Sequence, residues 1–64
     1  MQSKNYKFVD CECLGVSGKM VSIPAGMWPV VENQNATVLV NTRSLDLELN
    51  GFQLLKLDGR ATLV

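Results

Sequence analysis

The chain has no histidine, only two cysteines and only four aromatic residues among its 64 residues. Histidine is the commonest general acid and base in enzymes and a usual ligand of zinc. The five glycines stand singly, so there is no glycine-rich loop of the kind that binds phosphate. We therefore expect no catalytic residues, no metal and no cofactor, and we predict a non-enzymatic protein.

An excess of charge of either sign is also missing, because six lysines and arginines balance six acidic residues. A net charge of zero gives no general attraction to nucleic acid or to an anionic membrane. No apolar run approaches the roughly 20 residues of a membrane span. The segment MQSKNYKF at the start lacks the apolar stretch of a signal peptide. We therefore expect a cytoplasmic protein without a membrane partner.

The two cysteines, Cys11 and Cys13, are the only candidates for a covalent or metal-bound staple. Residues two apart in a strand point the same way, and no third cysteine can pair with either of them. We interpret them as reduced thiols that act as small core residues beside Val9. A chain of this length buries only about 60 % of the surface that its unfolded form exposes. Oligomerisation is therefore the favoured source of extra stability.

The residues that are present predict one domain over residues 1–64, built of strands. Two dipeptides typical of tight hairpin turns, Asn50-Gly51 and Asp58-Gly59, separate the segments LDLEL, FQLLKL and RATLV. They predict a C-terminal three-stranded meander over residues 45–64. With two-residue loops, one face of this meander holds the core residues Leu45, Leu47, Leu49, Phe52, Leu54, Ala61 and Leu63.

The opposite face of the predicted meander carries Leu55, Leu57 and Val64 and is too apolar to face water alone. Either a bulge near residues 54–55 turns these leucines inward, or another layer or chain covers them.

The first half predicts shorter strands. A long strand over about 5–16 is followed by a turn at Ser17-Gly18 and a returning strand over 19–23. The chain breaks at 24–26 and resumes over 27–32, where Pro29 indicates an edge strand or an irregular stretch. A polar turn at 33–35 leads into a strand over 36–41. About six or seven short antiparallel strands without helices predict an all-β fold, either a small SH3-like or OB-like barrel or a two-layer sandwich.

The segment around Trp28 holds the only tryptophan and both prolines. Tryptophan and methionine are enriched at protein interfaces, although Trp28 could equally fill one end of a small barrel. The predicted protein interface consists of Met27, Trp28, Leu55, Leu57 and Val64.

Nucleic-acid binding is the alternative function. The segment Lys4–Phe8 alternates basic and aromatic residues, as a surface for single strands would. The residues predicted for this alternative are Lys4, Tyr6, Lys7, Arg43 and Arg60.

We favour a non-enzymatic interaction or assembly module whose partners are a second copy of itself and another protein. Its compact, catalytically poor composition is typical of small regulatory or structural proteins of phages or mobile elements.

Overall fold

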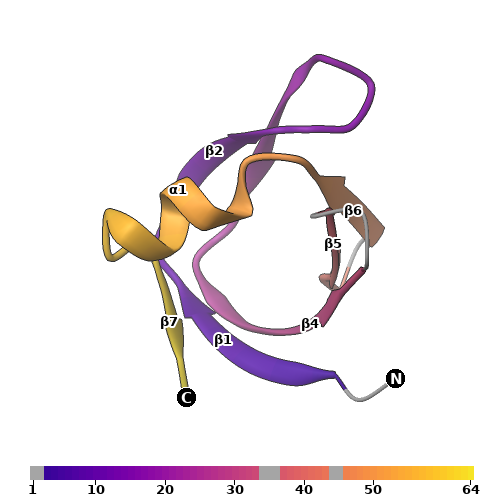
Figure 1. Ribbon diagram of the computed structural model, residues 1–64. Coiled ribbons are helices and arrows are strands. Elements are labelled where there is room, and N and C mark those ends of the chain that lie inside the picture. The colour runs from indigo at the N-terminus through magenta and orange to yellow at the C-terminus, as the bar shows by residue number, and fades with distance from the viewer. Residues whose placement is uncertain (1–2, 34–36, 44–45) are drawn as a thin grey trace.

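The computed structural model describes residues 3–33, 37–43 and 46–64, and within these ranges it holds seven strands and one short helix (Figure 1). The elements in chain order are β1 (Lys4–Phe8), β2 (Cys11–Leu14), β3 (Met20–Ile23), β4 (Gly26–Glu32), β5 (Val38–Asn41), β6 (Asp46–Leu49), α1 (Phe52–Leu57) and β7 (Ala61–Leu63). An antiparallel sheet of five strands has the order β6-β5-β4-β1-β7, and β2 and β3 form a hairpin. The predicted class of short antiparallel strands is confirmed, with one helix added. In the part of the chain described, no helix is long and apolar enough to cross a bilayer.

The core lies on the concave side of the sheet, beneath the hairpin and α1 (Figure 1). Alternation in β1 directs Tyr6 and Phe8 inward, and Phe52 from α1 meets the Tyr6 ring edge to face at a centroid distance of 5.1 Å. The fully buried side chains of largest volume are Phe8, Ile23, Leu49, Val30 and Val40.

Strand β4 belongs to two ladders. It pairs with β1 from Gly26 to Val30 and with β5 from Val30 to Glu32. Proline lacks a backbone N–H and is tolerated where one side of a strand is unpaired. Pro29 is paired only with Asn5 of β1, just before the ladder with β5 begins. The prediction that β4 lies at an edge is therefore wrong for the strand as a whole, although Pro29 itself has a paired neighbour on one side only.

The hairpin touches the far edge of the sheet through backbone hydrogen bonds. Gly15 forms an isolated bridge with Leu49, the Val16 N–H donates to the Glu48 carbonyl at 3.2 Å, and the Asn50 N–H donates to the Leu14 carbonyl at 2.7 Å. The hairpin and the five-stranded sheet otherwise remain separate ladders in the described residues. A closed barrel therefore stays a prediction.

The predicted C-terminal meander is wrong, because residues 52–57 form a helix rather than its middle strand. Gly51 has φ −112°, whereas a tight type I′ turn requires a positive φ there. Gly59 does have a positive φ, 74°, but it ends the helix. The Arg60 N–H donates to the Leu55 carbonyl and the Gly59 N–H to the Lys56 carbonyl, which is the Schellman pattern of a helix C-terminus.

The helix changes which leucines are buried. Phe52 and Leu55 lie three positions apart on one helical face and are both buried, whereas Leu54 is 66 % exposed. Leu63, also assigned to the core, is exposed at the edge strand β7. The predicted core residues Leu47, Leu49, Phe52 and Ala61 are confirmed, and Leu45 lies outside the described residues.

The long strand predicted over 5–16 divides into β1 and β2 at Val9 and Asp10. At this point the chain leaves the five-stranded sheet and enters the hairpin. The Asp10 carboxylate accepts a hydrogen bond of 2.7 Å from the Ala25 N–H, which joins the two ends of the hairpin. The turn at Ser17-Gly18 and the returning strand are confirmed as the β2–β3 connection and β3.

Candidate functional site

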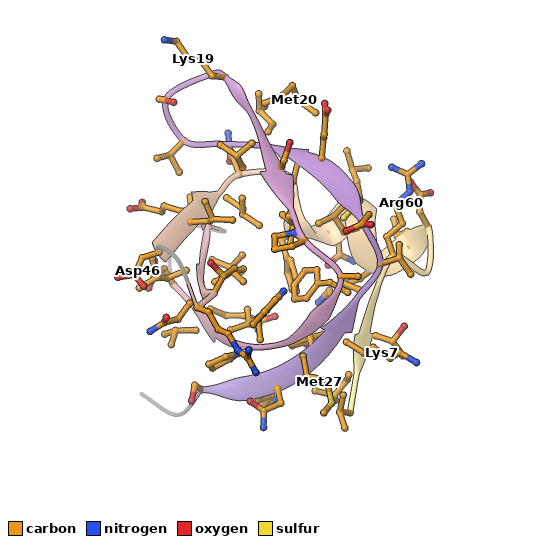
Figure 2. The ribbon with its side chains drawn as sticks, turned by 180° about the vertical axis from the view of Figure 1, so that it is seen from behind. Lys7, Lys19, Met20, Met27, Asp46 and Arg60 are labelled. Atoms are coloured by element: carbon orange, nitrogen blue, oxygen red, sulfur yellow. The ribbon has the colours of Figure 1, made fainter. Side chains whose placement is uncertain are left out.

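The residues predicted as a protein interface lie on different parts of the surface. Met27 faces outward on β4 beside Lys7 of β1, at the end of the molecule opposite Met20 (Figure 2). Leu57 and Val64 are also exposed. Leu55 is only 3 % exposed and belongs to the core, so little of its surface remains for a partner.

Trp28 is half-buried and packs against the core. Its indole Nε1–H donates to the Pro24 carbonyl at 2.9 Å. The ring covers Gly26, where an added Cβ would lie 2.7 Å from the indole Cζ2. The close approach explains why glycine stands at position 26, which also has a positive φ of 152°. Much of the Trp28 side chain therefore makes contacts within its own chain.

A concave, largely apolar surface lies between the hairpin and α1. We call it the hairpin–helix groove; it has a volume of 410 Å³. It is lined by Glu12, Cys13, Leu14, Met20, Asn50, Gly51, Leu54, Leu55, Asp58 and Arg60. Three of these are large apolar side chains left exposed, namely Leu14 at 40 %, Met20 at 58 % and Leu54 at 66 %. Exposed apolar side chains grouped around a hollow indicate an interaction surface.

The geometry of the groove follows from the hairpin register. Leu14 and Met20 are directly paired across β2 and β3, so their side chains stand together on the same face as Glu12. The start of α1 is held against β2 by the hydrogen bond from the Asn50 N–H to the Leu14 carbonyl. A side chain at Gly51 would begin 3.4 Å from the Cys13 sulfur, which shows how closely the helix approaches this strand. Leu54 of α1 lines the same groove as Leu14 and Met20.

Both thiols of the hairpin are held in the neutral form. Burial raises the pKa of the Cys13 thiol, and the backbone groups of Gly51 and Leu14 offset only part of the rise. Burial also raises the pKa of the Cys11 thiol, against a smaller lowering by the Arg60 charge. The thiolate is the reactive form of cysteine, so neither side chain is prepared as a nucleophile. Cys13 is buried and Cys11 half-buried.

The rim of the groove carries two carboxylates, Glu12 and Asp58, and one guanidinium, Arg60. Their formal charges sum to −1, so the groove combines large apolar side chains with a small negative charge. A surface of this kind is typical of protein interfaces, in which a desolvated centre is surrounded by a polar rim.

The fold separates most of the residues of the nucleic-acid alternative. The exception is Arg60, whose carbonyl accepts a hydrogen bond from the Val9 N–H, two residues from Lys7. Tyr6 is buried against Phe52, whereas Lys4 and Lys7 are exposed. Arg60 stands between α1 and β7, and Arg43 follows β5, which β4 separates from β1. None of the four aromatic side chains is fully exposed, and Trp28 is the only one that reaches the surface in part.

A second hollow, of 330 Å³, lies between the end of β4 and α1. Lys56 dominates its chemistry, because its ammonium lies 3.5 Å from a Glu32 carboxylate oxygen and 5.6 Å from the centroid of the Phe52 ring. A third, more open hollow of 490 Å³ lies beside Asp10 and Cys11. Over residues 3–33, 37–43 and 46–64 the structure contains no group of three or more potential metal ligands.

Sequence reasoning missed the three residues that define the groove. Leu14 follows Glu12 on the outward face of the predicted strand, and a turn centred on Ser17 would have placed Met20 opposite it, so this pair was available from the pattern. Leu54 was not, because it was assigned to the core of a strand that is a helix. In comparisons with known proteins, no family model, no curated protein and no solved structure gives a significant match to the chain.

Proposed function

We propose that the protein is a non-enzymatic interaction module that self-associates through the hairpin–helix groove. The observation that carries this proposal is the grouping of Leu14, Met20 and Leu54, all exposed, around one apolar hollow. Covering such side chains removes apolar surface from water, which is the main favourable term in protein association.

The small size of the chain supports the same proposal. No disulfide joins Cys11 and Cys13. A domain of this length gains relatively little from its own core, and association with a second copy is one of the usual ways to add stability. We propose that the module is an SH3-like small barrel. The support for this is the serial pairing of β4, β5 and β6, the return of β7 to β1, and the contact of the hairpin with β6.

The chemistry of the groove favours binding over catalysis. Among the described residues, its only thiol is that of Cys13, which is buried and has a raised pKa, and no serine, threonine or lysine lines it. Nucleic-acid binding ranks second because the aromatic side chains of β1 face the core. A surface for single strands needs exposed rings on which bases can stack.

Light scattering coupled to size exclusion tests the proposal over micromolar to millimolar concentrations. We expect the wild type to show a mass that is a multiple of 7.0 kDa. Met20→Glu and Leu54→Glu should each weaken association at least tenfold, because a carboxylate would be placed in the apolar centre of the interface.

Met27→Glu is the matched control, because Met27 is exposed to 61 %, much like Met20, but lies outside the groove. It should leave the association unchanged. A monomeric wild type at every concentration would refute self-association. A larger effect from Met27→Glu than from Met20→Glu would move the interface to the outer face of the sheet.

A further inference from the structure

The outer edge of β3 presents unpaired backbone groups in a defined order. The Gly15 N–H donates to the Lys19 carbonyl at 2.8 Å, which identifies this pair as hydrogen-bonded. Hydrogen-bonded and non-hydrogen-bonded pairs alternate along an antiparallel ladder. The pairs Leu14–Met20 and Glu12–Ser22 are therefore of the second kind. The N–H and C=O groups of Met20 and Ser22 consequently point away from β2.

This edge is protected against pairing only in part, by the shortness of β3 and by Lys19 and Pro24 on either side of it. Natural edge strands are commonly blocked by proline, by an inward charge or by a covering loop. The sequence of β3 is MVSI, with neither proline nor charge, and both Met20 and Ser22 are exposed. Among the described residues no backbone hydrogen bond outside the hairpin involves either of them. The hairpin also projects from the rest of the molecule, with Lys19 near its tip (Figure 2).

We propose that two copies of the chain join edge to edge through β3, in antiparallel orientation about a two-fold axis at Val21. In this register Met20 of each copy forms a hydrogen-bonded pair with Ser22 of the other, and all four outward groups of each strand are used. The ladder ends at Pro24, whose nitrogen has no hydrogen to donate. An antiparallel pair about a two-fold axis is self-complementary, so a second copy can occupy this edge with every outward backbone group paired.

The pairing is compatible with the charges and continues the proposed interface. Lys19 would lie opposite Ile23 of the second copy, so no like charges meet across the axis. Met20 and Ser22 project on the same face as Leu14 and Glu12. The two hairpins would form one four-stranded surface with the two Met20 side chains near its centre and a hairpin–helix groove at each outer side, which the strand pairing itself leaves uncovered. The inference rests on the proposed self-association and adds a second contact, beside the one made through the grooves.

Cross-linking tests this register directly. In a Cys11→Ala, Cys13→Ala background, Val21→Cys places one thiol beside the two-fold axis. The two Cα atoms there form a non-hydrogen-bonded pair about 4.5 Å apart, a separation that a disulfide can span. Ser22→Cys is the matched control, because the two copies of residue 22 are diagonal neighbours about 7–8 Å apart. With oxidised glutathione, the Val21→Cys dimer should form at least tenfold faster than the Ser22→Cys dimer.

Ser22→Pro provides a second measurement on the otherwise unaltered chain. It removes an outward N–H without removing a hydrogen bond between β2 and β3, so the folded state should persist in circular dichroism while association weakens at least tenfold. If Ser22→Pro does not fold, the cross-linking rates decide the question. Equal rates for the two cysteine variants, with the wild type still associating, would refute pairing through β3 and leave the proposed function intact. A monomeric wild type would refute both.

Discussion

Two adjacent leucines of α1 provide a sharp test of the fold, because the helix and the predicted meander assign them opposite environments. Leu55 is 3 % exposed and Leu54 is 66 % exposed. Replacing a buried leucine by alanine costs about 2–5 kcal/mol, whereas an exposed substitution usually changes the free energy of unfolding by less than about 0.5 kcal/mol. We therefore expect Leu55→Ala to be strongly destabilising and Leu54→Ala to be nearly neutral. The meander would reverse this order.

The expected loss is large for so small a domain. At typical values per residue, a 64-residue chain has a total free energy of unfolding of roughly 3–10 kcal/mol. Leu55→Ala should therefore lower the melting temperature by about 10 °C or more, since about 1 kcal/mol corresponds to about 4–8 °C in domains of this size. If that variant is unfolded at all temperatures, Leu55→Met keeps the side-chain volume and should cost less than about 1.5 kcal/mol.

Urea titration followed by Trp28 fluorescence measures these differences. It should be carried out at low protein concentration, so that association adds nothing to the apparent stability. Equal destabilisation by Leu54→Ala and Leu55→Ala would refute the helical assignment of residues 52–57. At high concentration Leu54→Ala should become destabilising in addition, because Leu54 lines the hairpin–helix groove.

Two further predictions concern the backbone and the thiols. Gly59→Ala should lower the melting temperature by about 4–8 °C, because Gly59 has a φ of 74° and a left-handed conformation costs other residues about 1 kcal/mol. Gly51→Ala is the control and should be tolerated, because Gly51 has a φ of −112°. Equal losses in the two variants would contradict the helix end described above. Because the pKa of the buried Cys13 thiol is raised, this thiol loses its proton in the unfolded state at a lower pH than in the folded state. The free energy of unfolding should therefore be unaffected by this group below pH 9.0 and should fall as the pH rises above it. A decline of the same size in Cys13→Ala would assign the effect to other groups.

The fold could be predicted from the sequence wherever one local pattern decided the structure. Alternation placed Cys13 inward, and Ser17-Gly18 marked the hairpin turn. The same alternation placed Val9 in the core beside the cysteines and was wrong there, because the strand is interrupted at residues 9–10 and Val9 is exposed. The turn signal at Asn50-Gly51 failed because FQLLKL is compatible with two structures: its apolar residues alternate, yet they also occur three positions apart. Packing of Phe52 against Tyr6, at the other end of the chain, stabilises the helix, and a reading of local pattern contains no information about that contact.

The candidate site was less predictable than the fold, because it is formed by residues far apart in the chain. Leu14 and Met20 belong to the hairpin and Leu54 to the helix. Their proximity depends on the hydrogen bond between Asn50 and Leu14, which joins α1 to β2. Trp28 was predicted as an interface residue from its residue type alone. Its indole donates a hydrogen bond to the Pro24 carbonyl and covers Gly26, so part of the side chain is in contact with its own chain.

The ladder between β1 and β7 joins the first and the last strand of the chain. Tyr6 pairs with Leu63, and the Val64 N–H donates to the Asn5 carbonyl at 3.1 Å, so the start of β1 and the end of β7 lie side by side. A short linker could therefore join them, and new ends could be opened at Gly18, where no atom lies within 4 Å of an added Cβ. In this circular permutant the most distant strand pair along the chain would become a local hairpin. Opening the hairpin would at the same time make β2 and β3 the most distant pair along the chain and move β1 farther from β4. Since local contacts form faster than distant ones, the permutant should fold more slowly than the original chain while keeping the same folded structure.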